Sequence, residues 1–327
     1  MKKSKALFTA AFCSLLSAVI LSCSTTVPVK VKRPAKLDMQ GAQTLAVLPF
    51  QPRYVDVTLS QSNVRSLYSS SYSNDKDYRD KEEICSNITY ALESTLASTE
   101  YYELQNSTRV KVALERGTEI PADAYIYGYI SDYTCSDVLK NKKEVETEGA
   151  EPLYYRYVKA RITYQIIKAS TNRVIASDYY TLEGDGSIVD KNRNRLETPY
   201  QILKSDINSM VITIGKQIQP YYETIHLSLL SDKTKNPEMK VADTLAEKGY
   251  IEQAQQKFEQ IYREDGNFAA GYNSALLLEA MGELDEAKMQ MEELVNITGN
   301  KQAIKALQNI EYELKQRERL QTQELFR

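Results

Sequence analysis

Residue types that usually build catalytic and metal sites are scarce in this sequence. Among 327 residues there is no tryptophan and one histidine, His226. A single histidine excludes multi-histidine metal sites, and it leaves His226 as the only possible base of a histidine-dependent triad. The phosphate-binding pattern Gly-x-x-x-x-Gly-Lys-Ser/Thr does not occur. The sequence therefore predicts no catalytic residue, no cofactor and no metal, and an unrecognised envelope enzyme is the least favoured function.

Excess positive charge and long apolar runs are also lacking. The formal net charge is −3, from 41 basic and 44 acidic side chains. An acidic chain lacks the excess of basic side chains that binds nucleic-acid phosphates, so no nucleic-acid partner is predicted. After residue 21, no apolar run approaches the ~20 residues that a membrane-spanning helix needs. The body of the chain is therefore expected to fold in water.

The N-terminus has the order of a secretory signal peptide. Lysines in residues 2–5 precede a weakly polar to apolar run at residues 6–21, and the small Ser22 stands before Cys23. The run Ile20-Leu-Ser-Cys23 resembles the lipobox of bacterial lipoproteins. The resemblance implies that residues 1–22 are removed and that Cys23 is acylated. We expect a lipid-anchored protein of the bacterial cell envelope, and Ser24 favours the outer membrane, facing the periplasm.

Hydropathy patterns divide the rest of the chain. Residues 23–43 are interpreted as a tether, because their start is polar and two prolines exclude a helix. Residues 44–230 predict a layered α/β domain. Its strands are expected at 44–50, 101–105, 124–130, 154–167 and 174–182, and its helices at 79–98, 106–117 and 199–218.

Several short motifs of residues 44–230 resemble one family. They are the run Leu45-Ala-Val-Leu-Pro-Phe50, then Tyr101-Tyr-Glu-Leu104, Ala122-Asp-Ala-Tyr-Ile-Tyr-Gly128 and Ile218-Gln-Pro-Tyr-Tyr222. Their order is similar to that of the curli-secretion lipoprotein CsgG and of LpoB-like and TolB N-terminal domains. The resemblance implies a domain that binds other envelope proteins. A CsgG-type secretion pore, or a curli-like export component, is the rival function.

Residues 238–320 contain an internal repeat. Gly249-Tyr250-Ile251, with Ala254 and Phe258, recurs 33 residues later as Gly282-Glu283-Leu284 with Ala287 and Met291. This spacing resembles the tetratricopeptide repeat, whose period is ~34. Two helical hairpins are expected at 238–266 and 270–299, with a closing helix at 301–320. An all-α domain of this kind presents a concave groove to protein partners.

Five side chains follow from these patterns as candidate sites. Aligned on the two glycines, Asp243, Tyr272 and Glu279 are expected to face the groove and to bind a basic partner segment. Cys85 lies near the start of the first helix and Cys135 just past the third strand, so a disulfide between them is possible in an oxidising compartment. We predict a non-enzymatic adaptor that binds envelope proteins through the helical repeats and the membrane through the lipid on Cys23.

Overall fold

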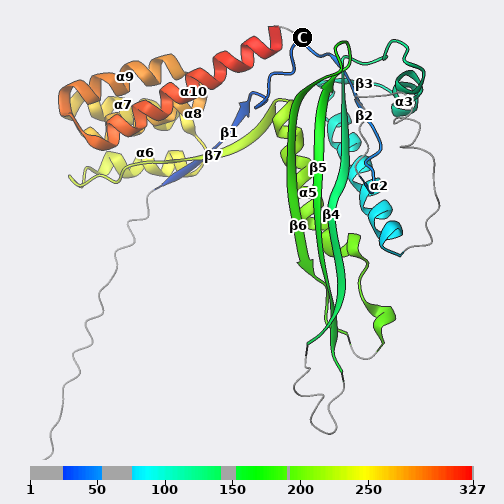
Figure 1. Ribbon diagram of the computed structural model, residues 1–327. Helices are drawn as coiled ribbons and strands as arrows, with labels where there is room; N and C mark the ends of the chain where they lie inside the picture. The colour runs from blue at the N-terminus through cyan, green and yellow to red at the C-terminus, as the bar shows by residue number, and fades with distance from the viewer. Residues whose placement is uncertain (1–24, 54–75, 141–151, 190–191, 326–327) are drawn as a thin grey trace, which may run out of the picture. The chain divides into compact units, whose positions relative to one another are not determined.

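The computed structural model describes residues 25–53, 76–140, 152–189 and 192–325 (Figure 1). The chain forms two compact units. One, the α/β unit, comprises Lys32–Glu223 and Gln316–Arg327. The other, the helical unit, comprises the chain up to Val31 together with Thr224–Lys315. Within the described ranges, no helix is both long enough and apolar enough to cross a membrane.

A five-stranded sheet forms the centre of the α/β unit, in the order β3-β2-β4-β5-β6. Strand β2 is parallel to both its neighbours, whereas β4, β5 and β6 form an antiparallel meander. The strands are β2 Thr44–Val47, β3 Glu103–Leu104, β4 Ala124–Leu139, β5 Tyr154–Lys168 and β6 Arg173–Asp185. Strand β4 is longer than the sequence predicts, because the period-two pattern fades where its residues become exposed.

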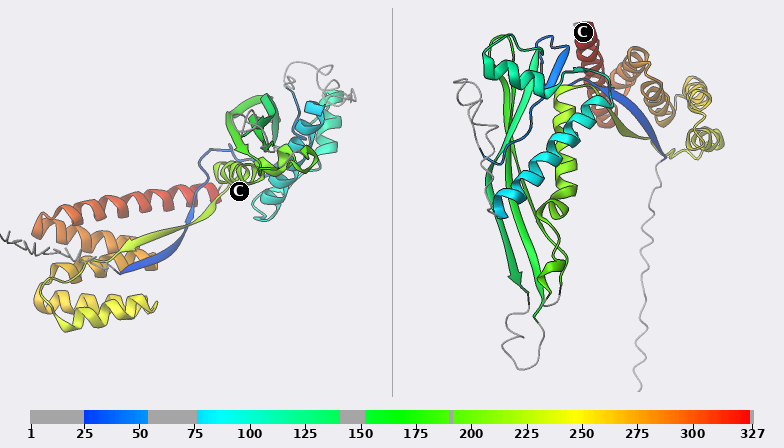
Figure 2. Two further views of the ribbon diagram at one scale, coloured as in Figure 1. Left: turned by 90° about the horizontal axis from the view of Figure 1, so that it is seen from below. Right: turned by 90° about the vertical axis from the view of Figure 1, so that its right-hand side faces the viewer.

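Two helices cover one face of this sheet (Figure 2). They are α2 Lys76–Ala97 and α5 Pro199–Ile218. Their apolar stripes pack on the inward residues of β5, including Val158, Ala160 and Ile162, all of which are fully buried. Pro199 opens α5, and Thr198 forms a capping box with Gln201, which explains why the start of this helix was predictable.

The opposite face is partly covered by α3 Ser107–Arg116. Asn106 caps its first turn and Gly117, at φ 64°, ends it. Beneath it lie two buried tyrosines, Tyr125 and Tyr127, so these rings belong to the core. The Tyr125 hydroxyl donates to Asn172 Oδ1 at 2.7 Å, which satisfies its polar end.

The helical unit contains two helical hairpins and most of a closing helix. The elements are α6 Pro237–Glu247, α7 Ile251–Asp265, α8 Phe268–Met281, α9 Leu284–Thr298 and α10 Lys301–Leu325. Helices α7, α8 and α9 each end at a glycine with positive φ, namely Gly266, Gly282 and Gly299. The small residues Ala254, Ala270, Ala275 and Ala287 are buried where the helices approach one another.

Part of the stretch predicted as a tether is a strand. β1 Thr26–Arg33 and β7 Tyr221–Ser228 form a two-stranded sheet. Val27, Val29 and Val31 alternate with polar residues and Pro28, which is the strand period. Pro28 is tolerated because every strand of a two-stranded sheet is an edge strand. Residues 26–33 are therefore not a free connector.

The fold class agrees with the sequence at the level of architecture. The chain is mixed α/β up to β7 and wholly helical afterwards within the described residues. The predicted domain limits, 44–230 and 238–320, differ from the compact units in three respects. The segment up to Val31 and residues 224–230 belong with the helices, and the last turns of α10 belong with the α/β unit.

Candidate binding site

The helices of the helical unit pack against the chain's own extended segments. Val27 of β1 and Leu229, which directly follows β7, are buried in the same apolar cluster as Met239 of α6 and Leu276 of α8. Val29 and Leu230 pack against this cluster from its edge. Extended segments of this chain therefore pack against α6 and α8, the helices on which partner binding was predicted.

One buried amide side chain holds the occupying segment in place. Asn273 of α8 accepts a hydrogen bond from the Leu230 N–H at 2.6 Å, and its Nδ2 donates to the Leu230 carbonyl at 3.0 Å. Asn273 is fully buried. A side-chain amide that satisfies both backbone groups of one residue binds extended chain in a single register. This arrangement can recognise peptide backbone.

Two of the three predicted groove residues lie on α8 and are largely covered. Glu279 is only 6 % exposed. Tyr272 is half-buried, and its ring centre lies 6.1 Å from that of Phe268. Burial and the nearby charge of Glu279 raise the pKa of Tyr272. A partner could reach Glu279 only after the surrounding chain had moved.

The third predicted groove residue belongs to a different group of side chains. Asp243 of α6 is half-buried, and burial, followed by the charges of Glu247 and Asp232, raises its pKa to about 6. Each of these three effects disfavours the carboxylate. Asp243 is thus a carboxyl group whose surroundings favour the protonated form.

A structured loop joins the occupying segment to α6. Asp232 accepts hydrogen bonds from the Thr234 and Asn236 N–H groups, at 2.9 and 2.7 Å, and from Asn267 Nδ2 at 3.1 Å. Partial burial opposes its ionisation, but these hydrogen bonds outweigh burial and lower its pKa. Asp232 therefore fixes the loop beside a cavity of about 750 Å³ at the first residues of α8.

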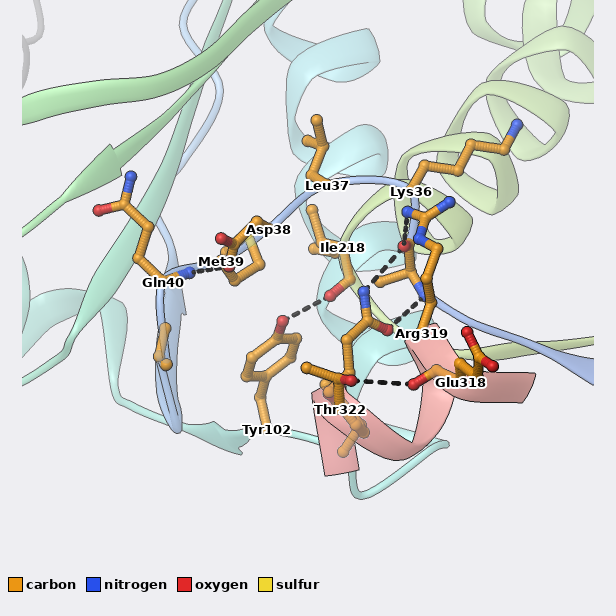
Figure 3. Close-up of a pocket in the computed structure, with 15 residues that line it drawn as sticks. Lys36, Leu37, Asp38, Met39, Gln40, Tyr102, Ile218, Glu318, Arg319 and Thr322 are labelled. Carbon is orange, nitrogen blue, oxygen red and sulfur yellow. Dashed lines mark hydrogen bonds between the residues drawn. The ribbon is translucent and has the colours of Figure 1, made fainter. Parts of the chain in front are cut away.

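The α/β unit has a cavity of similar size, about 750 Å³ (Figure 3). Residues 35–42, Tyr101, Tyr102 and the last turns of α10 line it. Gln323 binds both backbone groups of Ala35, accepting from its N–H at 2.8 Å and donating to its carbonyl at 3.0 Å. The Tyr102 hydroxyl donates to the Ile218 carbonyl. Several backbone and amide groups of this wall are thus hydrogen-bonded to one another.

The predicted cysteine sites have different outcomes. Cys23 lies outside the described residues. Cys85 and Cys135 contribute to the same apolar cluster, but both are free thiols and no disulfide joins them. Cys85 is 2 % exposed, and burial raises its pKa strongly. In the described ranges, no group of three or more His, Cys, Asp or Glu side chains could hold a metal ion.

The residues that pack on α6 and α8 could not be identified from the sequence. Val27, Leu229, Leu230 and Asn273 were not singled out, although the Val27, Val29 and Val31 alternation was a readable strand signal. Asn273 gave no signal of its own, because its role depends on a backbone segment 43 residues away in sequence.

Comparisons with known proteins give no family. No family model matches the chain, and no curated protein matches it. Solved structures do resemble part of it. The PelC dodecamer of Paraburkholderia phytofirmans is 12 % identical, with a TM-score of 0.29, over 59 % of this chain and 98 % of that one. Lipoprotein GNA1162 of Neisseria meningitidis is 10 % identical, with a TM-score of 0.26, over 53 % and 97 %.

A third similar structure is hypothetical protein CT253 of Chlamydia trachomatis. It is 10 % identical, with a TM-score of 0.29, and the match covers 53 % of this chain and 95 % of that one. Likenesses this distant carry no argument about activity or partners.

Proposed function

We propose that this protein is a lipoprotein of the bacterial cell envelope, anchored by its lipid in the outer membrane and facing the periplasm. We propose further that it acts as a non-enzymatic adaptor for other envelope proteins. The N-terminal pattern that ends at Cys23 supports the anchor. The hairpins α6–α7 and α8–α9, similar to tetratricopeptide repeats, support the adaptor role, because such hairpins bind peptide segments.

One observation carries the proposal. Thr25, the first residue that the structure describes, lies two positions after Cys23 and is hydrogen-bonded within the helical unit. Its carbonyl accepts from the Leu229 N–H at 2.8 Å, and its hydroxyl donates to Glu247 at 3.1 Å. A lipid on Cys23 would therefore hold the helical unit close to the membrane, where an adaptor for envelope proteins would act.

The covered groove refines the adaptor proposal. A partner that binds on α8 must take the place of Leu229 and Leu230 on Asn273, or bind beside them through Tyr272. A competing segment would therefore be extended and apolar, with a free backbone N–H and carbonyl for Asn273. Direct binding of a basic segment by Glu279 needs this displacement as well, because Glu279 is only 6 % exposed.

Two measurements test the proposal. Mass spectrometry of the protein purified from membranes should find an acylated peptide beginning at Cys23. Retention of residues 1–22, or an unmodified Cys23, would contradict the anchor. Crosslinking in the native envelope should capture partner proteins, and Tyr272→Ala should reduce capture while Tyr312→Ala does not. Tyr312 is a suitable control because it is 54 % exposed on α10.

The rival functions predict different results. A secretion pore would form rings with steady conductance in planar bilayers, and that finding would replace the adaptor proposal. An enzyme would consume a substrate without a stoichiometric protein partner. Tyr272→Ala is the informative variant, since Glu279→Lys would place a longer side chain of opposite charge where only 6 % of Glu279 is exposed and so disturb α8 itself.

A further inference from the structure

The position of Thr25 limits how far the membrane can lie from the helical unit. Cys23 is two residues before Thr25, and two residues of chain span at most ~7 Å. Thr25 is held by Glu247 of α6 and by the backbone of Leu229. If Cys23 is acylated, as proposed above, the lipid is attached within this short distance of Thr25. Most of the tether predicted for residues 23–43 therefore does not act as a free spacer.

Helix α6 is the first helix of its unit and leaves one face exposed. Glu247, the partner of Thr25, lies seven residues and two helical turns after Lys240, so both side chains share a face. Val241 is 48 % exposed, and Lys248 is exposed beside this face. We use the name α6 face for the exposed residues of α6 and its flanks, namely Lys233 and Lys235 in the preceding loop, Lys240 and Val241 in the helix, and Lys248 at its C-cap.

The α6 face carries four lysine charges, and the carboxylates of Asp232, Asp243 and Glu247 lie nearby, so the balance is weakly positive. The four lysines are exposed, and none makes an ion pair within the described residues. Three of the nearby acidic side chains have partners within the unit, but among the described residues only the Glu238–Lys257 contact cancels a charge. Asp232 accepts hydrogen bonds from its own loop, Glu238 pairs with Lys257, and Glu247 accepts from Thr25.

From this placement we infer that the α6 face is a membrane-contact surface, and that its lysines bind the anionic phospholipid headgroups of the leaflet that holds the anchor. Two features of the chain lead to this occupant. The lipid attachment point lies next to α6, and basic side chains close to a membrane are attracted by anionic lipids within about a Debye length. Val241 would lie at the level of the headgroups.

The other terminal helix provides a matched surface. The first part of α10 also exposes three lysines, Lys301, Lys305 and Lys315, and an apolar side chain, Ile304, which is 39 % exposed. Lysines and an exposed aliphatic residue are thus present at both ends of the helical unit. Of these two surfaces, the α6 face is the one that adjoins Thr25. We therefore expect lipid contact at the α6 face and not at the α10 surface.

The absence of tryptophan from the sequence allows a clean fluorescence test. The complete protein with its native N-terminus is purified as Val241→Trp and, for comparison, as Ile304→Trp. Each variant is reconstituted in phosphatidylcholine vesicles with about one-third phosphatidylglycerol, with and without headgroup-proximal brominated lipid. The emission of the Val241→Trp protein should shift to the blue and lose about half its intensity on bromination, because interfacial side chains reach the depth of the quencher. The emission of the Ile304→Trp protein should change little.

Charge reversal then tests the lysines. In the Val241→Trp background, Lys233→Glu with Lys235→Glu and Lys240→Glu should return the quenching to the level seen in purely zwitterionic vesicles. The corresponding changes on α10, Lys301→Glu with Lys305→Glu and Lys315→Glu, should leave it unchanged. The difference in quenching between these two triple variants should become smaller in high salt, because salt screens the attraction of the lysines to anionic lipid.

The outcomes separate the inference from the proposed function. Mass spectrometry of the same samples shows whether Cys23 is acylated. An acylated Val241→Trp protein whose emission is not quenched overturns the membrane-contact surface and leaves the lipoprotein proposal standing. A protein that is not acylated overturns both. Equal quenching of the Val241→Trp and Ile304→Trp proteins also overturns the inference, because it would show no preference for the α6 face.

Discussion

Asn273 binds Leu230 through both of that residue's backbone groups, at 2.6 Å for the N–H and 3.0 Å for the carbonyl. The two residues are 43 positions apart, and the amide that joins them is fully buried. This pair connects the segment that follows β7 to the second hairpin of the helical unit. It also holds Leu230 against α8.

Asn273→Ala should destabilise the helical unit by about 2–3 kcal/mol, because two buried backbone groups lose their partner. Urea unfolding measures the loss, and proteolysis near residues 230–236 should become faster. Asn309→Ala, at an exposed position of α10, is the matched control and should change stability little. Equal unfolding midpoints for the two variants would show that the Leu230 contact adds nothing.

Asp243 should make the helical unit less stable as pH rises. Its folded pKa of about 6 lies above the reference value of 3.8, so the native state binds more protons between these values. The free energy of unfolding therefore falls from about pH 4 to pH 6 and stays low above it. Asp243→Asn should raise stability at pH 7.5 by roughly 1 kcal/mol, after allowance for solvent screening of a half-exposed group.

The measurement for Asp243 is urea unfolding of wild type and variant across pH 4 to 8. Glu252→Gln, an exposed change on α7, removes the same charge and serves as control. The gain from Asp243→Asn should disappear near pH 4. A constant gain at every pH would mean that packing, and not ionisation, is responsible.

Gly128 cannot accept a side chain while Phe50 keeps its position. A Cβ on Gly128 would lie 2.1 Å from Cε1 of the Phe50 ring, and Phe50 is 4 % exposed. Gly128→Ala should therefore cost about 1–3 kcal/mol. Phe50→Leu in the same chain should recover part of this loss, which a double-mutant cycle would measure.

A second glycine provides the contrast for that experiment. Gly215 lies inside α5, and an added Cβ would meet the Thr95 methyl group at 3.4 Å, which a small shift of that methyl can relieve. Gly215→Ala should be neutral or stabilise the α/β unit by up to about 1 kcal/mol, since alanine favours the helix. Similar losses at both sites would argue against a specific clash with Phe50.

The two internal cysteines should differ in reactivity. Burial raises the pKa of both thiols, but Cys85 is almost completely covered whereas Cys135 is partly exposed. We expect a thiol reagent to modify Cys135 first, and Cys85 at least about tenfold more slowly, because its reaction requires local opening. Cys85→Ser and Cys135→Ser assign the two phases. Loss of both reactive thiols without reductant would reveal a disulfide.

Local chemistry made much of the secondary structure predictable. The helix after Asn106 ends at Gly117, and the helix after Thr198 begins at Pro199, where the sequence placed them. The helices of the hairpins end at or just before a glycine with positive φ, namely Gly249, Gly266, Gly282 and Gly299. Each of these signals acts within a few residues, through caps, fixed proline φ or glycine φ, so no knowledge of distant neighbours is needed.

The candidate site could not be predicted in the same way. Asp243, Tyr272 and Glu279 were placed by alignment of two repeats, which gives a position along a helix but not what covers it. Glu279 is buried because other parts of the chain lie over α8. Burial of this kind depends on which segment fills the groove, and a repeat period contains no information about that segment.

What the sequence determined by itself is therefore the set of local patterns: the apolar run before Cys23, the alternation of β4 and β5, and the two hairpins with their glycine ends. What only the tertiary structure decided is that β1 pairs with β7, that Leu229 and Val27 are buried in one apolar cluster with α6 and α8, and that Asn273 binds Leu230. The reason is physical. Caps and periodicity act between near neighbours, whereas burial and backbone pairing join residues that only the folded chain brings together.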